Sequence, residues 1–158
     1  GGEAHEAGCG CILVVNKWDL RAGERDAVAE YRVAVQEKFR YLAHAPVAFV
    51  SALTGNRVMQ LFALIDAVAA ERERRIPTSQ LNAAIQQAVE RRPPPSERGR
   101  PVRIRYATQV SIKPPTFLLF ATAKNQLHFS YLRYLENFLR NLYGFRGTPI
   151  RLVVRGRA

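Results

Sequence analysis

The sequence predicts an α/β segment followed by a small α+β unit. Two short apolar runs, 11–15 and 47–50, are typical of strands buried in a parallel sheet, and apolar residues at helical spacing follow each of them. Beyond residue 77 the pattern changes to helix, strand, strand, helix, strand. We therefore expect one domain over residues 1–77 and a second over residues 78–158.

The first half is expected to contain two amphipathic helices beside its two strands. One helix is predicted over 24–42, and Pro46 ends its pattern before the second strand begins. The other is predicted over 58–75 and ends in a charged tail. The apolar positions that define these helices are Val28, Tyr31, Val35, Phe39 and Leu42, and then Val58, Leu61, Phe62, Ile65 and Val68.

The break between the halves lies at Pro77. Proline disfavours helix in the residue before it, and Thr78 or Ser79 is expected to cap the helix that follows. That helix is amphipathic, and a stiff, basic, proline-rich stretch over 93–101 comes after it. Its apolar face is formed by Leu81, Ala84, Ile85, Ala88 and Val89.

The remaining segments are two strands, a helix and a last strand. The strands are predicted over 102–112 and 116–122, and the last one over 150–154. A helix over 128–143 precedes that last strand, with Gly144 as its C-terminal cap. This helix is expected to bury Tyr131, Leu132, Leu135, Phe138, Leu139 and Leu142 and to expose Arg133, Glu136, Asn137, Arg140 and Asn141.

The positive charge of the chain is concentrated in its second half. The sequence has 24 Lys and Arg against 13 Asp and Glu, a net charge of +11. Residues 1–77 are balanced, whereas residues 78–158 have Glu90, Glu97 and Glu136 as their only acidic residues. Such a basic module indicates a polyanionic partner such as RNA. Its densest cluster is Arg91, Arg92, Arg98, Arg100, Arg103, Arg105 and Lys113.

The cysteines and histidines do not indicate a metal site. Cys9 and Cys11 stand two residues apart, so we expect both on one face of a strand, as core residues in a reducing compartment. A zinc site would lack ligands, because the three histidines are scattered. With no long apolar run and no export signal, we expect a cytoplasmic protein without a membrane segment, and a monomer.

Candidate base-binding residues stand where the two predicted parallel strands end. Asn16, Lys17, Trp18 and Asp19 follow the first strand, and Ser51, Ala52 and Leu53 follow the second. Guanine offers two donors on one edge, and a single carboxylate such as Asp19 can accept both. Asn16 would face the base edge and tie the loop together, and the Lys17 stem would pack along the base plane. The Ala52 N–H would point at guanine O6, at the strand ends where open α/β sheets bind ligands.

These residues supply base specificity but no chemistry. Phosphoryl transfer requires a loop of the form G-x-x-x-x-G-K-[ST], a magnesium ligand and a group that orients the attacking water. The sequence contains no such phosphate-binding loop. We therefore expect this polypeptide alone not to hydrolyse GTP and to bind it weakly.

Longer segments lie at 4–8, 14–19, 51–55, 105–110, 114–117, 128–137 and 147–152. They resemble the Der (EngA) family of ribosome-assembly GTPases, and the resemblance covers nearly the whole chain. It implies part of a P-loop GTPase fold followed by a KH-like domain. The parent protein would have two tandem nucleotide domains, bind GTP or GDP with Mg²⁺, and act with ribosomal RNA in assembly of the large ribosomal subunit. We expect the chain to be a fragment of such a parent, since it begins at Gly1 without Met.

The resemblance also raises the question of where RNA would bind. Gly144 and Gly147 match the G-x-x-G loop with which KH domains grip RNA, but a helix cap and a turn explain them better, since a strand follows instead of a second helix. Aromatic residues could stack on bases, although the helical spacing of Tyr131 favours the core. The candidates are Tyr106, Tyr131, Tyr134 and Phe145.

Three functions remain open at this point. The first is a ribosome-assembly factor switched by GTP, whose basic domain touches ribosomal RNA and reports the state of the nucleotide domains. The second is a nucleotide-independent basic RNA-binding module from a truncated gene, with residues 1–77 as a scaffold. The third is a protein-docking domain whose charge is incidental.

Overall fold

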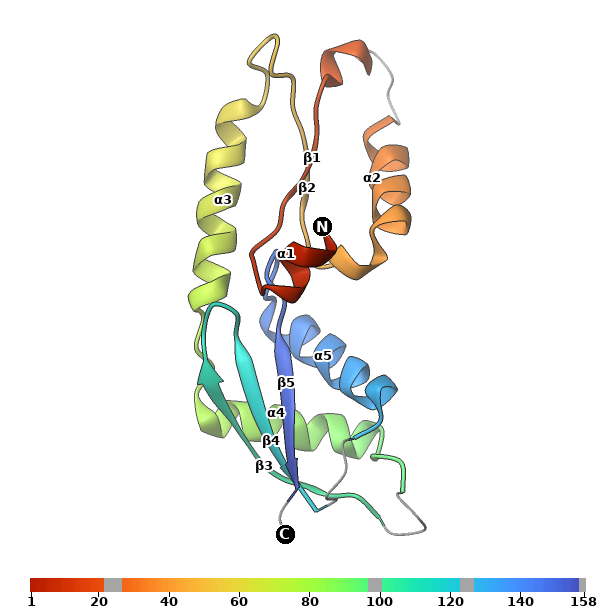
Figure 1. Cartoon of the computed structure of the whole chain (residues 1–158), viewed down its shortest axis with the longest axis vertical. Helices are drawn as coiled ribbons and strands as arrows, with labels where there is room; N and C mark the ends of the chain where they lie inside the picture. The colour runs from red at the N-terminus through yellow and green to blue at the C-terminus, as the bar shows by residue number, and fades with distance from the viewer. Residues whose placement is uncertain (22–26, 97–100, 123–126, 157–158) are drawn as a thin grey trace. The chain divides into compact units, whose positions relative to one another are not determined.

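The computed structural model describes residues 1–21, 27–96, 101–122 and 127–156 (Figure 1). The chain divides into two compact units. The first comprises Gly1–Arg72 together with Arg146–Pro149, and the second comprises Glu73–Phe145 together with Ile150–Ala158.

The first unit is α/β and contains a small parallel sheet. Strands β1 and β2 pair in parallel, with Val15 opposite Phe49. A crossover through α2 connects them, as parallel pairing requires. In chain order the elements are α1 (Gly2–Glu6), β1 (Leu13–Val15), η1 (Trp18–Arg21), α2 (Ala27–Lys38), η2 (Arg40–Leu42), β2 (Val47–Phe49) and α3 (Val58–Glu73).

The segment before β1 corrects the expectation for the cysteines. Cys9 is exposed and Cys11 is half-buried, and both precede the strand. The Cys11 N–H donates to the carbonyl of Gly147 at 2.7 Å, so this residue is bonded to a loop and not to the sheet. Neither cysteine is therefore a core residue of a strand.

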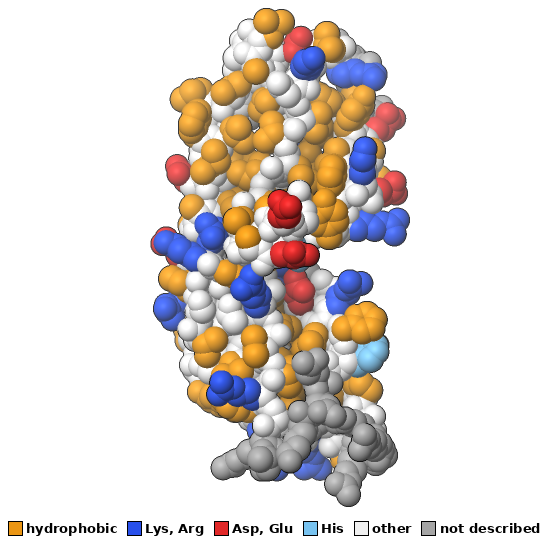
Figure 2. All heavy atoms as spheres, viewed as in Figure 1, with side chains coloured by type: hydrophobic (Ala, Val, Ile, Leu, Met, Phe, Trp, Pro, Cys, Tyr) orange, Lys and Arg blue, Asp and Glu red, His pale blue; other side chains and the backbone are white. Residues whose placement is uncertain are grey.

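The apolar side chains of the first unit are less buried than expected. The prediction that β1 is buried on both faces is wrong, since Val14 is exposed; in the described part of the chain this sheet has only two strands. On α3, Val68 is buried whereas Phe62 and Ile65 are exposed. Figure 2 shows hydrophobic side chains across the face formed by this unit. The start predicted for the first helix, at residue 24, lies outside the described residues.

The second unit packs two helices on one face of a three-stranded sheet. The strand order is β3-β4-β5, with β3 antiparallel and β5 parallel to the central β4. Buried residues from both helices and all three strands, or the segments beside them, form one apolar cluster. The elements are α4 (Thr78–Arg91), β3 (Ile104–Ser111), β4 (Thr116–Ala121), α5 (Phe129–Tyr143) and β5 (Arg151–Gly156).

Side-chain hydrogen bonds connect β3 with α4 and with the segment before that helix. The Asn82 side chain on α4 accepts from the Ala107 N–H and donates to the Ala107 carbonyl, both at 2.8 Å. Gln109 accepts from the Ile76 N–H at 2.8 Å. These contacts fix α4 against an edge strand that would otherwise present unpaired backbone groups.

The start of α4 differs from the expectation. Pro77 occupies the N-cap position, and no side chain caps the helix. The predicted cap by Thr78 or Ser79 is therefore wrong, because the chain enters the helix one residue earlier than a Thr78 cap would require. The buried face is as expected, with Leu81, Ala84, Ile85 and Ala88 in the core.

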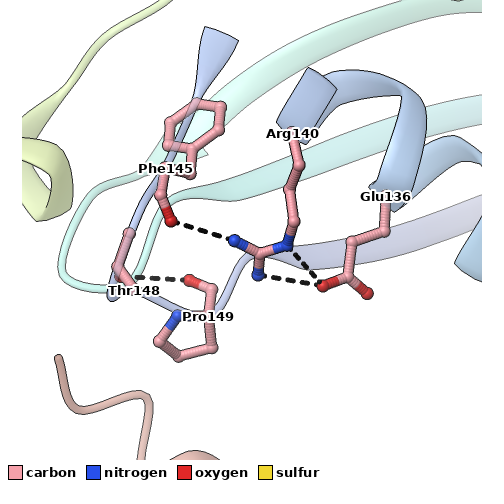
Figure 3. A network of polar contacts seen from close by, with 5 residues as sticks. All are labelled: Glu136, Arg140, Phe145, Thr148 and Pro149. Carbon is pink, nitrogen blue, oxygen red and sulfur yellow. Dashed lines mark hydrogen bonds and ion pairs between the residues drawn. The ribbon is translucent and has the colours of Figure 1, made fainter. Parts of the chain in front are cut away.

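The end of α5 is held by a charged contact (Figure 3). The Arg140 guanidinium donates to Glu136 Oε1 at 2.9 and 3.1 Å and to the Phe145 carbonyl at 2.9 Å. Both charged side chains are consequently partly buried and not fully exposed as predicted. Conversely Leu142, expected in the core, is exposed. Gly144 caps the helix, and its N–H donates to the Arg140 carbonyl at 2.8 Å.

Candidate functional site

The carboxyl ends of β1 and β2 bring the two candidate base-binding segments together. The parallel register places Val15 beside Phe49, and the Val50 N–H donates to the Val15 carbonyl at 3.0 Å. The Trp18 N–H then donates to the Val50 carbonyl, also at 3.0 Å. The loops that follow the two strands therefore lie side by side.

Asn16 links these loops through its side chain. Its Oδ1 accepts from the Lys17 N–H at 2.8 Å and from the Ala52 N–H at 3.1 Å. Lys17 itself has φ of 60° and an exposed side chain. Asn16 is thus positioned to hold both loops at a fixed separation.

Asp19 is oriented by a buried hydroxyl. The Ser51 Oγ donates to Asp19 Oδ1 at 2.5 Å, and Ser51 is only 1% exposed. The same Oγ accepts from the Thr54 N–H at 3.2 Å, and the Ser51 N–H donates to the Asn56 carbonyl at 3.1 Å. The Asp19 carboxylate is therefore held where the two loops meet.

Trp18 anchors the first loop by aromatic contacts. Its ring packs against Phe49, with centroids 4.5 Å apart, and edge-on against Tyr31 at 5.4 Å. Leu53, in contrast, has an 87% exposed side chain. Sequence reasoning did not identify the supporting roles of Thr54 and Asn56, although small polar residues after a strand commonly form such turns.

The described members of the predicted basic cluster are all exposed but differ in their contacts. Lys113 forms an ion pair with Glu73. Arg91 and Arg92 lie over the rings of Phe138 and Tyr134, at 5.4 and 5.5 Å from the centroids. Arg103 and Arg105 are exposed, and Arg98 and Arg100 lie outside the described residues.

The aromatic candidates separate into core and surface residues. Tyr131, expected in the core, is buried, and so is Phe145, which therefore cannot stack on a base. Burial, with a smaller contribution from Tyr134, raises the pKa of Tyr131 to about 12, and its hydroxyl donates to the Arg92 carbonyl at 2.7 Å. The hydroxyl of Tyr134 donates to the Ala88 carbonyl. Tyr106 is exposed.

The G-x-x-G match at 144–147 is occupied by contacts within the protein. In the first unit the Gly147 N–H donates to the His44 carbonyl, and its carbonyl accepts from the Cys11 N–H, both at 2.7 Å. A Cβ at this glycine would overlap the side chain of Val68. The backbone groups that a gripping loop would offer to RNA are therefore already used.

The residues that the structure describes form neither a metal-binding cluster nor a helix that could cross a membrane. Within these ranges, no three His, Cys, Asp or Glu side chains are grouped so that they could hold a metal ion. No helix in the described part of the chain is long and apolar enough to cross a membrane.

Comparison with known proteins identifies the family. Residues 75–155, just over half of the chain, match a family described as the C-terminal KH-domain-like region of EngA bacterial GTPase enzymes. The chain belongs to the EngA, or Der, family. The KH-like domain of this EngA chain thus extends from α4 to β5, the helices and strands of the second unit.

Proteins named GTPase Der match nearly the whole chain. The protein from Moorella thermoacetica is 51% identical over 154 residues, which are 98% of this chain and 35% of the relative. Those from Pelotomaculum thermopropionicum and Streptococcus uberis are 49% and 46% identical, over 98% and 99% of the chain. The EngA chain spans about a third of the length of these curated relatives.

Proposed function

We propose that the chain is the guanine-reading part of a GTPase and that its KH-like domain contacts ribosomal RNA in assembly of the large ribosomal subunit. The observation that carries the first part is the junction of two loops through Asn16 and Asp19. The ribosomal role comes from the family resemblance and is supported by the basic second half. Such a role would place the protein in the cytoplasm.

Asp19 is the residue that would recognise guanine. A carboxylate has about four lone-pair positions, so accepting one bond from Ser51 leaves room for the ring N1–H and the exocyclic amine of the base. The Ser51 hydroxyl would fix the carboxylate before the base arrives. Adenine has no matching pair of donors on this edge and would be rejected.

The other residues of the two loops would position the base. The Ala52 N–H, which donates to Asn16, would be shared with guanine O6. The Lys17 stem would cover the base plane, and Trp18 would hold the loop to Phe49. Leu53, whose side chain is exposed, would contribute through its backbone only.

The exposed apolar surface of the first unit supports its being part of a larger nucleotide domain. Val14, Phe62 and Ile65 are exposed, and contiguous apolar surface on a protein marks a contact site. We propose that the rest of a P-loop GTPase fold covers these residues in the full-length protein. That part would supply the phosphate-binding loop and the Mg²⁺ ligands, because the chain contains no G-x-x-x-x-G-K-[ST] sequence.

A specificity switch tests the proposal. The chain would replace the matching segment of the Moorella GTPase Der, and Asp19→Asn would be introduced into this chimera. Xanthine has an oxygen where guanine has its exocyclic amine, and an amide can donate to that oxygen whereas a carboxylate cannot. The variant is expected to gain binding of a fluorescent xanthosine diphosphate, measured by titration.

The gain of binding is more informative than a loss. The family resemblance implies another nucleotide domain, which could hide a loss of GDP binding, but xanthosine binding can arise only at the altered residue. Glu30→Gln, at an exposed carboxylate on α2, is the matched control and is expected to leave xanthosine binding absent. An Asp19→Asn chimera that folds but does not bind the xanthosine nucleotide would disprove the assignment.

The second candidate is a nucleotide-independent RNA-binding module. The separate apolar core of the KH-like domain favours it, because that core needs no residue from the nucleotide-binding loops. The RNA affinity of the chimera in different nucleotide states distinguishes the two candidate functions. RNA affinity that changes between GDP and a GTP analogue supports the switched factor, and equal affinities at every salt concentration support the independent module.

A further inference from the structure

The face of the KH-like sheet opposite the helices carries an aromatic and basic row. Alternate residues of β4 point to opposite faces, and Phe117, Leu119 and Ala121 are buried in the core. Phe120 therefore points to the other face. The register places it between Tyr106 of β3 and Arg155 of β5.

The two rings of this row form a platform that solvent reaches. Their centroids are 5.8 Å apart with an interplanar angle of 40°, and Tyr106 and Phe120 are 46% and 37% exposed. They line a hollow of about 770 Å³. A hollow of this volume is within the range of about 300–1,000 Å³ that small-molecule sites occupy. The other described residues of its lining are Arg105, Ala121, Thr122, Arg155 and Gly156.

The charge around the platform has one sign. Arg105 and Arg155 line the hollow and are exposed, and neither has a side-chain acceptor in the described part of the chain. No Asp or Glu occurs in β3, β4 or β5. Figure 2 shows basic and hydrophobic side chains in the region of these strands. The face thus combines exposed rings with exposed arginines that have no acidic partner among the described residues.

We propose that this face binds single-stranded RNA, with bases stacked on Tyr106 and Phe120 and phosphates paired with Arg105 and Arg155. The inference rests on the RNA contact proposed above and assigns it a site. Exposed rings on a flat sheet stack on unpaired bases, and guanidinium groups pair with phosphate oxygens. The groups needed for both contacts lie around one hollow.

The composition of the face favours RNA over a protein partner. A protein interface core is depleted of charge, whereas this row ends in the exposed Arg155. A base-paired duplex would also fit poorly, since its bases are stacked on one another and unavailable to the two rings. An unpaired strand supplies free base faces and one phosphate per nucleotide, which matches the platform and its arginines.

The test uses the whole chain and a 12-nucleotide RNA that contains 2-aminopurine, a base whose fluorescence falls when it stacks. Tyr106→Leu and Phe120→Leu keep apolar volume but remove the ring face. Each is expected to weaken binding about tenfold and to reduce the quenching, because stacking on one aromatic side chain contributes roughly that much. Phe120→Tyr, which keeps the ring, is expected to keep both the RNA affinity and the quenching of the unchanged chain.

Matched controls separate this face from the rest of the basic surface. Phe129→Leu removes a 68% exposed ring on α5 and should leave affinity unchanged. Arg155→Gln should lower the slope of log affinity against log salt by about 0.7, the value for one phosphate contact on a single strand. Arg133→Gln, at an exposed arginine of α5, should change the slope less.

The outcomes distinguish failure of the site from failure of the RNA role. If Tyr106→Leu and Phe120→Leu bind and quench like the unchanged chain, the sheet face is not the site, although the RNA contact itself stands. If the unchanged chain binds neither single-stranded nor duplex RNA, both proposals fail. If polyglutamate displaced the bound RNA as readily as unlabelled single-stranded RNA does, the inference would be overturned, because the face would then attract negative charge alone.

Discussion

The Ser51 hydroxyl donates to the Asp19 carboxylate at 2.5 Å and so joins two loops that are 32 residues apart in the chain. Ser51 is buried and also accepts from the Thr54 N–H. A single small side chain thereby fixes both the turn after β2 and the carboxylate proposed to read guanine. The stability of the turn and base recognition are therefore coupled.

Ser51→Ala is expected to destabilise the first unit. The change leaves the Asp19 oxygen and the Thr54 N–H without their partner, which costs about 1–2 kcal/mol. Urea unfolding followed by the fluorescence of Trp18, the single tryptophan of the chain, measures the loss in this unit. Ser79→Ala, at an exposed position of α4, is the control. Equal midpoints for the two variants would contradict the assigned role of Ser51.

Asn82→Ala is expected to weaken the edge of the KH-like sheet. The change removes both bonds to Ala107 and leaves a backbone N–H and carbonyl of a buried residue unpaired, at a cost of about 1–3 kcal/mol. Hydrogen exchange should show the Ala107 amide exchanging faster than in the unchanged chain. Asn141→Ala, at an exposed position of α5, should leave this amide protected. Protection that survives Asn82→Ala would show that the bond is not formed in solution.

Gly147→Ala is expected to destabilise the first unit by a steric overlap. The new Cβ would lie 2.9 Å from Val68 Cγ1 and closer still to Cγ2, and such overpacking typically costs 1–3 kcal/mol. Gly55→Ala is the matched control, since Gly55 has φ of 73°, close to the 77° of Gly147, and open space around it. The difference between the two variants measures the overlap alone.

A second change tests the same contact. Val68→Ala shortens the side chain that the new methyl group would meet, so the double variant should lose less stability than the sum of the losses in Gly147→Ala and Val68→Ala. Additive losses in the double variant would instead place Val68 away from Gly147.

The two cysteines should differ in reactivity and in pH dependence. Burial, and secondly the nearby Cys9, raise the pKa of the Cys11 thiol, whereas Cys9 is exposed. The thiolate is the reactive form, so Cys11 should be alkylated slowly at neutral pH, and its rate should continue to rise at pH values where an ordinary thiol has levelled off. Mass spectrometry after iodoacetamide treatment locates each modification. In Cys9→Ser the slow reaction should remain, and rapid labelling of Cys11 would contradict its burial.

The convergence of the two candidate base-binding loops was predictable because it depends on strand topology. Two apolar runs separated by a helical segment indicate parallel pairing, and parallel strands end at one edge. The individual bonds were not predictable. Spacing along the chain does not show that Ser51 would bond to Asp19, or that Trp18 would face Phe49.

Burial was harder to predict where both faces of an element are apolar. In β4, Leu118 and Phe120 alternate with Phe117 and Leu119, so the sequence alone does not show which pair faces the core. The platform residue Phe120 was missed for this reason. On α5, an apolar stripe indicated that Leu142 is buried, but Arg140 turns inward to bind the Phe145 carbonyl.

Photolabelling tests the central claim most directly, because it locates the bound base. The chimera described above would be irradiated with 8-azido-GDP, and the modified residues would be identified by mass spectrometry. Labelling within 16–19 or 51–54 that GDP prevents and ADP does not is the result expected for a guanine site formed by Asp19 and Ala52. Labelling confined to other segments, or prevented equally by ADP, would contradict it.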